Sequence, residues 1–246
     1  MKVLAIVQAR MGSTRLPGKV LRQVNGKALL EYQIERMERA KTIDQLIICT
    51  STREVDDPII ELCKKMNVDT FRGSENDVLG RFYETSSFYK GEVIVRLTAD
   101  CPLIDPDVID RAISFFLDNY PKLLYVSNTR KRTYPRGMDT EVFSYQLLQD
   151  AYMNANMPHD LEHVTPFMIK RIDSSAVGQI VYSRDESKHR WTVDTIEDFT
   201  LIEKILSELY PLKPEFTLED VLALLNRNQA WTQINEKVDQ KEDGTN

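Results

Sequence analysis

The chain has 246 residues, of which 42% are hydrophobic and 28% are charged, and its formal net charge is −6. These values are typical of one large or two small globular domains, and they argue against general binding to nucleic acid or to a membrane surface. No apolar run approaches the roughly 18 residues of a membrane span. The three scattered cysteines form no C-x-x-C pair, which favours inert buried thiols and a cytoplasmic location.

Strands and helices are predicted to alternate over the first half of the chain. The apolar run Val3–Val7 is too short for a helix and predicts a buried strand. Helical spacing follows over residues 28–40. Further strands are predicted at 45–51, 68–73 and 92–97, and further helices at 57–66, 77–89 and 105–117. This alternation predicts an α/β fold with parallel strands, whose ligands bind beyond the carboxyl ends of the strands.

The regular alternation of predicted strands and helices ends after about residue 120. Strands are predicted at 123–128, 139–144 and 176–183, helices at 145–154 and 159–171, and a short strand from Arg190 that leads into an amphipathic helix ending near Tyr210; a last helix covers 217–228. We interpret residues 1–246 as a single domain with a small β-containing insertion at about 125–183 and a polar tail at about 236–246.

A cationic loop follows the first strand, although the chain as a whole is acidic. The segment QARMGSTRLPGK contains three cations, two glycines and two hydroxyl side chains, namely Arg10, Arg15, Lys19, Gly12, Gly18, Ser13 and Thr14. Such loops present backbone N–H groups to anions, arginine matches phosphate oxygens, and glycine permits close approach or a positive φ. The loop fits neither the P-loop pattern nor G-x-G-x-x-G. It therefore predicts a different triphosphate site, with a solvated basic loop as the alternative.

Two aspartates follow predicted strands. Asp100 comes after residues 92–97 and Asp194 follows the short strand near residue 190. Carboxylates at such positions can bind Mg²⁺, which takes one or two of them together with water and phosphate oxygens. Taken singly, each aspartate could instead cap a helix or a turn. The nearby cationic loop favours the metal interpretation.

The segment His159–His163 matches the pattern H-x-x-E-H of some zinc proteases. Its two histidines lie one helical turn apart, but no third ligand is evident and Pro166 shortens the helix. We interpret the segment as a helix start with one functional and one surface histidine.

The basic run TRKRTYPR at residues 129–136 allows two interpretations. It is either a solvated loop or a flap over an anionic sugar, and in the second case Arg136 is our candidate to bind a substrate carboxylate.

Five segments in chain order resemble the sugar cytidylyltransferases, such as the CMP-KDO and CMP-acylneuraminate synthetases. They are QARMGSTRLPGK, TADCPLID, YPRGMDTEVFS, LEHVTPF and WTVDTIEDF. The resemblance implies a Rossmann-like three-layer nucleotide-diphospho-sugar transferase fold with a mostly parallel central sheet. It also implies transfer of CMP from CTP to a sugar or sugar-acid hydroxyl with release of pyrophosphate, a Mg²⁺ cofactor, a homodimer, and a role in surface or spore-coat polysaccharide biosynthesis.

The resemblance also implies residue roles. Lys19, Arg15, Asp100 and Asp194 would be catalytic, and the last two would bind the metal. The nucleotide would contact Arg10, Gly12, Ser13, Arg15, Lys19, Arg81 and Asp100, with Arg81 being the nearest counterpart, in GSENDVLGRFYE, of an SGTDR-like motif. The sugar site or a dimer contact would involve Arg136, Gly137, Asp139, Glu141, Glu162 and His163.

Three other functions stay open from the sequence. The chain could be a glycosyltransferase with a nucleotide-sugar donor, a nucleotidyltransferase for another nucleoside triphosphate, or a non-catalytic nucleotide-binding subunit. A glycosyltransferase would usually carry a D-x-D-like metal motif, and Asp105–Asp107 fits that pattern formally. The Pro106 that follows Asp105 makes a helix start the better interpretation.

Overall fold

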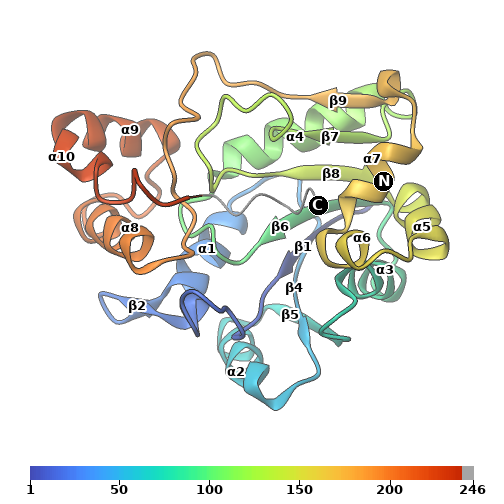
Figure 1. Cartoon of the computed structure of the whole chain (residues 1–246), viewed down its shortest axis with the longest axis horizontal. Coiled ribbons are helices and arrows are strands. Elements are labelled where there is room, and N and C mark those ends of the chain that lie inside the picture. Colours follow the sequence, from blue (N-terminus) through green and yellow to red (C-terminus); the bar gives the residue numbers. More distant parts are fainter. Residues whose placement is uncertain (240–246) are drawn as a thin grey trace.

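A seven-stranded sheet forms the centre of the protein in the computed structural model, which describes residues 1–239 (Figure 1). The strand order is β5-β4-β1-β6-β8-β7-β9. Within the described residues, β8 alone runs antiparallel to the other six strands. The strands are β1 (Val3–Gln8), β4 (Gln45–Ser51), β5 (Asp69–Gly73), β6 (Val93–Thr98), β7 (Tyr125–Ser127), β8 (Glu141–Ser144) and β9 (Val177–Gln179). The predicted α/β class and mostly parallel sheet are confirmed.

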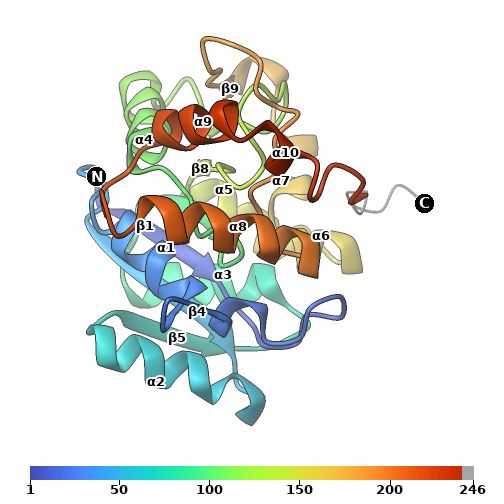
Figure 2. The ribbon, with the colours of Figure 1, turned by 90° about the vertical axis from the view of Figure 1, so that its left-hand side faces the viewer.

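Helices cover both faces of the sheet (Figures 1 and 2). One hydrophobic core contains residues of α1 (Leu29–Met37), α2 (Asp57–Met66), α4 (Pro106–Asn119), α8 (Ile196–Leu209) and α9 (Leu218–Arg227). The other contains residues of α3 (Val78–Phe88), α5 (Tyr145–Asn154) and α7 (Thr165–Arg171), and α6 (Pro158–His163) packs beside them. The remaining helices are α10 (Gln229–Thr232) and the 3-10 helices η1 (Lys19–Leu21), η2 (Glu54–Asp56) and η3 (Ser174–Ala176).

The central strand shows why the sheet has two cores. Val3, Ala5 and Val7 of β1 belong to the first core, and Leu4 and Ile6 belong to the second. Successive side chains of a strand point to opposite faces, so a continuous apolar run is buried on both sides. The helices on both faces therefore follow from the composition of this strand.

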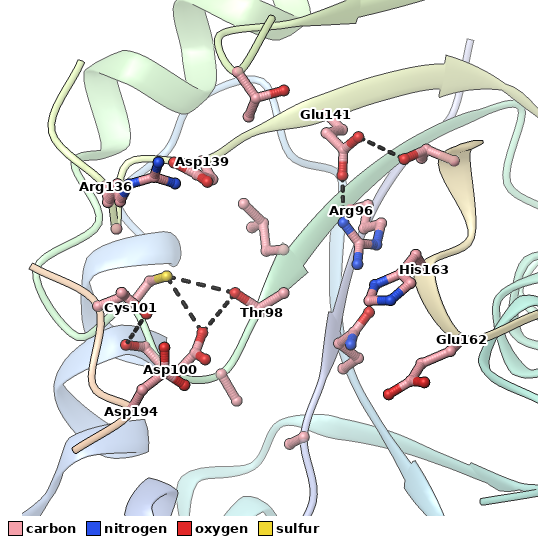
Figure 3. A pocket seen from close by; sticks show the side chains of 18 of the residues that line it. Arg96, Thr98, Asp100, Cys101, Arg136, Asp139, Glu141, Glu162, His163 and Asp194 are labelled. Atoms are coloured by element: carbon pink, nitrogen blue, oxygen red, sulfur yellow. Dashed lines mark hydrogen bonds and ion pairs between the residues drawn. The ribbon is translucent and has the colours of Figure 1, made fainter. Parts of the chain in front are cut away.

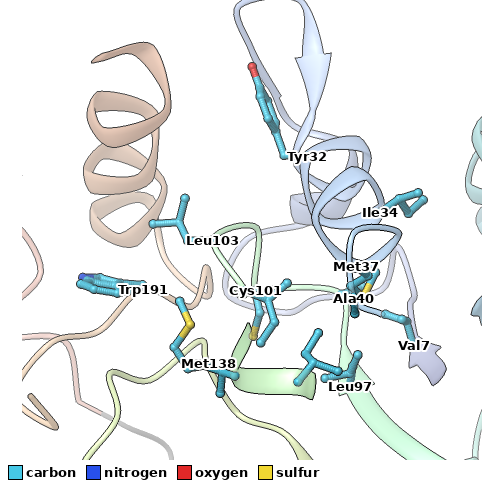
Figure 4. Close-up of a cluster of buried hydrophobic side chains, with 14 of the residues drawn as sticks. Val7, Tyr32, Ile34, Met37, Ala40, Leu97, Cys101, Leu103, Met138 and Trp191 are labelled. Carbon is cyan, nitrogen blue, oxygen red and sulfur yellow. The ribbon is translucent and has the colours of Figure 1, made fainter. Parts of the chain in front are cut away.

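The cysteines are buried single thiols, as predicted. Burial raises the pKa of the Cys63 thiol to about 12 and that of Cys101 well above its ordinary value. Figure 4 shows Cys101 in the first core, which also contains Met138 and Trp191. Among residues 1–239, no helix combines the length and the apolar character that crossing a membrane requires.

Two predicted elements differ from the structure. The helix predicted at 159–171 is split into α6 and α7 by Val164, whose φ is 69°. A continuous helix would bring the ring of Pro166 against the carbonyl of Glu162, so the break relieves this clash. The strand predicted near Arg190 is only a single bridge to Arg136.

A small hairpin was not predicted. It joins β2 (Gln23–Val24) to β3 (Lys27–Ala28) through Asn25 and Gly26, which both have positive φ. The dipeptide Asn-Gly is a strong signal for such a turn, so the sequence does contain the information.

Residues 125–183, which the sequence analysis treats as an insertion, contribute strands to the main sheet. β7, β8 and β9 form the edge beyond β6, and β9 covers only part of the predicted 176–183 strand. The helices α5, α6 and α7 connect β8 to β9.

Candidate active site

An open cavity of about 860 Å³ lies at the carboxyl ends of β1 and β6. The cationic loop, the turn after β6, the loop 129–139, the helices α6 and α7, and the segment 192–194 form its walls. It brings together twelve of the residues that the sequence analysis selected: Arg10, Ser13, Arg15, Lys19, Asp100, Arg136, Gly137, Asp139, Glu141, Glu162, His163 and Asp194. The cavity lies at the position predicted for ligands of a parallel sheet.

Lys19 joins the two predicted metal carboxylates. Its Nζ atom lies 2.7 Å from Oδ2 of Asp100 and 2.8 Å from Oδ1 of Asp194, and its side chain is only 12% exposed. The left-handed residue Gly18, with φ 66°, precedes Lys19 at the start of η1. Arg15 also reaches Asp194, with 3.1 Å between Nη2 and Oδ2. Two carboxylates thus contact one ammonium group, although Asp100 lies 81 positions and Asp194 lies 175 positions from Lys19 in the sequence.

The opposite charges of Lys19 and its two carboxylate partners stabilise the charged forms of Lys19 and Asp100. Burial alone would lower the pKa of Lys19, but the carboxylates of Asp100 and Asp194 outweigh burial and raise it above its ordinary value of 10.5. Burial alone would raise the pKa of Asp100, but Lys19 and the hydroxyl of Thr98 lower it below 3.8. Both groups are therefore charged at neutral pH.

Asp194 is held by residues that the sequence analysis did not select. Nη2 of Arg190 donates to its Oδ2 at 2.7 Å, and Arg190 also pairs with Asp198. The helix cap is provided by Thr195 and Asp198, which form a capping box at the start of α8. The capping alternative for Asp194 is therefore wrong. The signal Thr-x-x-Asp before an apolar helix was present in the sequence.

The carboxylate of Glu141, on the far side of the cavity, is held by partners within the protein (Figure 3). Glu141 accepts hydrogen bonds from Tyr125 at 2.5 Å and Thr165 at 2.7 Å, and it pairs with Arg96. Each oxygen of this carboxylate therefore has a partner within the protein, which fixes its orientation.

The basic loop 129–138 forms a wall of the cavity. Arg132 and Arg136 line it, whereas Arg130 and Lys131 are exposed. Arg132 forms a two-point contact with Asp139, with nitrogen–oxygen distances of 2.5 and 2.8 Å. The loop is therefore not fully solvated, and Arg132 is a lining residue that was not among the predicted site residues. The flap over an anionic sugar stays a prediction.

Gly137 cannot be replaced without strain. Its φ is 100°, and a Cβ atom would lie 2.8 Å from the backbone carbonyl of Trp191. We expect Gly137→Ala to lower the free energy of unfolding by about 1–3 kcal/mol. Gly12→Ala is the matched control, because the nearest atom to its Cβ would be 3.8 Å away and its φ is not positive. Urea unfolding of both variants measures the difference, and equal stabilities would contradict this account.

Gly12 and Arg81 lie outside the main cavity. Arg81 lines a neighbouring cavity of about 350 Å³, which shares Gln8, Ala9, Arg10 and Glu162 with the first. Arg81 is buried and donates to the carbonyl of Ser74 at 2.8 Å. Arg10 and Glu162, 3.8 Å apart, form an ion pair between the two cavities.

The H-x-x-E-H segment at 159–163 and the D-x-D-like segment at 105–107 do not form metal sites among the described residues. The rings of His159 and His163 lie 4.6 Å apart, but only His163 lines the cavity. Among residues 1–239, no group of three or more His, Cys, Asp or Glu side chains is placed to hold a metal. Asp105 is buried and accepts from the backbone N–H groups of Asp107 at 2.9 Å and Leu218 at 2.5 Å. It is a helix cap, as predicted, and lies outside the cavity.

Comparison with known proteins identifies the family of the chain. A family model described as Cytidylyltransferase matches residues 4–226. The spore coat polysaccharide biosynthesis protein SpsF of Bacillus subtilis is 36% identical over 234 residues, which cover 92% of this chain and 95% of the relative. A solved cytidylyltransferase of Leptospira borgpetersenii has a TM-score of 0.90 and 34% identity, covering 98% of this chain and 100% of that chain. A CMP-KDO synthetase solved with CTP shares the fold, with a TM-score of 0.65, 16% identity and coverage of 85% and 99%.

Proposed function

The chain belongs to the cytidylyltransferase family, and from this premise we propose that it transfers the cytidylyl group of CTP to a hydroxyl of a sugar or sugar acid, releasing pyrophosphate. The observation that carries the proposal is the convergence of Lys19, Arg15, Asp100 and Asp194 in one cavity at the carboxyl end of the sheet. Cations for a triphosphate and carboxylates for a metal ion are both required for this chemistry.

The two cavities suggest how the nucleotide would lie. Arg10, Ser13, Arg15 and Lys19 offer donors to the phosphates in the main cavity. The smaller cavity beside Arg81 would take the nucleoside, because it opens from the same end of β1 through Gln8 and Arg10. The far side of the main cavity, with Asp139, Glu141 and Arg136, would take the sugar.

Asp100 and Asp194 fit a Mg²⁺ ion. Both carboxylates reach one cation, the Lys19 ammonium, within 2.8 Å, and oxygen atoms are the ligands that Mg²⁺ prefers. When bound, this ion would polarise a phosphoryl oxygen and neutralise developing negative charge.

The protein contributes position and charge to the reaction. A sugar hydroxyl oxygen forms a bond to the α-phosphorus in line and gives up its proton to solvent. The bond from that phosphorus to the pyrophosphate oxygen breaks, and pyrophosphate leaves with that electron pair. Lys19 and Arg15 are placed to offset the negative charge that builds on the leaving pyrophosphate. The buried partners of Glu141 and the two-point contact of Arg132 with Asp139 hold both carboxylates as fixed acceptors for sugar hydroxyls.

The biological role and the assembly extend the same proposal. The relative from Bacillus subtilis is named for spore coat polysaccharide biosynthesis, which supports a role in the biosynthesis of a surface polysaccharide. The homodimer stays a prediction from the family resemblance.

Thermal stability with each of CTP, UTP, ATP and GTP, with and without Mg²⁺, tests the donor first. A ligand at about 100 times its dissociation constant stabilises by about 2.7 kcal/mol, which is a shift of roughly 5–10 °C for a chain of this size. We expect the shift with CTP, an increase with Mg²⁺, and loss in Arg15→Ala but not in the control Arg171→Ala. Arg171 is exposed, pairs with Asp150 and lies outside both cavities.

Product analysis with a panel of sugar acids and neutral sugars tests the reaction. We expect pyrophosphate to be released together with a CMP-sugar. Release of a nucleoside diphosphate from a nucleotide-sugar would favour a glycosyltransferase instead, and nucleotide binding without turnover on any acceptor would favour a sensing subunit.

A further inference from the structure

We propose that Arg190, held by Asp198 and Asn235, is a positioning residue that presents Asp194 to the cation site of the cavity. The segment near Asn235 would then be a functional part of the active site. This inference rests on the proposed function.

Arg190 links the carboxylates of Asp194 and Asp198, which lie four residues apart in the sequence. Its side chain is 8% exposed. Nη2 donates to Oδ2 of Asp194 at 2.7 Å, and Nε donates to Oδ1 of Asp198 at 2.9 Å. The planar guanidinium donates through separate nitrogen atoms, Nη2 to Asp194 and Nε to Asp198, so it fixes the two carboxylates in a set geometry.

Asp198 fixes the backbone beside Asp194. The Asp198 side chain is fully buried, and its Oδ2 accepts from the N–H of Asp194 at 3.0 Å and from the N–H of Thr195 at 3.1 Å. Backbone and side chain of Asp194 are therefore both restrained. Its Oδ2 faces Arg190 and Arg15, which leaves Oδ1 directed at Lys19.

Asn235 joins this network from a distant part of the chain. It is 4% exposed, and its Nδ2 donates to the carbonyl of Arg190 at 2.8 Å and to Oδ1 of Asp198 at 2.8 Å. These partners lie 45 and 37 residues earlier in the sequence. The contact therefore ties the segment after α10 to the residues that hold Asp194.

The charges give the network a function beyond packing. Asp100, Asp194 and Asp198 are balanced by Lys19, Arg15 and Arg190, all within one connected set of ion pairs and hydrogen bonds. Residues that orient a metal ligand through hydrogen bonds typically change metal affinity or activity 10–100-fold when they are removed. We therefore expect the affinity for a divalent cation to depend on Asn235 and Arg190.

The test is a titration of the full-length protein with Mn²⁺ in the presence of CTP, following the paramagnetic resonance signal of the unbound ion. We expect the dissociation constant to rise about 10-fold in Asn235→Ala and Arg190→Lys, and more in Arg190→Met. The KM for Mg²⁺ should rise in the same order, with a smaller change in the KM for the acceptor. Asn235→Ala keeps the test usable if Arg190→Met fails to fold.

The control is Arg36→Lys. Arg36 is also a buried arginine, but it donates to the carbonyls of Ile104 and Phe216 and lines neither cavity. This variant should lose thermal stability and keep the wild-type Mn²⁺ affinity.

The outcomes separate the inference from the proposed function. If the wild type binds Mn²⁺, and the dissociation constants of Asn235→Ala and Arg190→Lys stay within twofold of the wild-type value, the positioning role is wrong while the proposed function stands. If the wild type does not bind Mn²⁺ with CTP, the metal site of the proposed function fails and this inference fails with it.

Discussion

Lys19→Met is expected to lower kcat by about 100-fold or more, and to change the KM for CTP much less. Removing a single charge-stabilising donor at the reacting centre typically costs 10²–10³ in kcat. Arg10, Arg15 and Ser13 stay in the cavity and would still bind the triphosphate. The methionine keeps most of the volume of the lysine stem, so packing changes little.

Lys27→Met is the matched control for this prediction. Lys27 is also an ion-paired lysine, with Nζ 2.5 Å from Glu35 and 2.6 Å from the hydroxyl of Tyr210, but it lies outside both cavities. Steady-state measurement of pyrophosphate release should separate the two variants. An unchanged kcat in Lys19→Met would remove Lys19 from the mechanism.

Asp100→Asn is expected to have two effects, on turnover and on the pH dependence of stability. Losing one of the two carboxylates that would hold Mg²⁺ removes several kcal/mol of charge stabilisation, which corresponds to roughly 10²–10³ in kcat. The same change removes the partner that Lys19 contacts at 2.7 Å. We expect a loss of about 1.5–3 kcal/mol in the free energy of unfolding at neutral pH, the range for hydrogen bonds to charged groups.

The pH dependence follows from the two shifted pKa values. The pKa of Asp100 is lowered in the folded protein, so its contribution is present above the unfolded value near 3.9 and is lost as the pH falls through the folded pKa. The pKa of Lys19 is raised, so its contribution is present below about 10.4 and is lost as the pH rises through the folded pKa. The stability difference between wild type and Asp100→Asn should therefore be constant between about pH 5 and 9 and shrink below about pH 4.

Urea unfolding between pH 3 and pH 8 measures this profile, and Asp105→Asn is its control. Asp105 caps α4 and lies outside the cavity, so this variant should lose stability while keeping turnover. Loss of turnover in Asp105→Asn with a normal Asp100→Asn would instead support the D-x-D motif and a glycosyltransferase.

Much of the fold could be predicted because it is encoded locally. A continuous apolar run such as Val3–Val7 can only be buried on both faces, and Pro106 after Asp105 starts a helix whatever surrounds it. The two errors have different sources. Val164 interrupts a helical pattern because of Pro166, a local signal that the spacing of apolar residues had outweighed. The segment around Arg190 forms one bridge to Arg136 instead of a strand, which only the tertiary structure shows.

The sequence by itself determined the class of the fold, the cationic loop at the end of the first strand, and the two aspartates that follow strands. Only the tertiary structure decided how these groups meet. Lys19 lies 81 residues from Asp100 and 175 residues from Asp194, and no local pattern states that one ammonium contacts both. The role of Asn235 was hidden for the same physical reason, since its hydrogen bonds reach residues 37 and 45 positions earlier in the chain. Arg132 and Arg190 pair with residues only 7 and 4 positions away, but only the packing of the sheet and its helices places these pairs at the cavity.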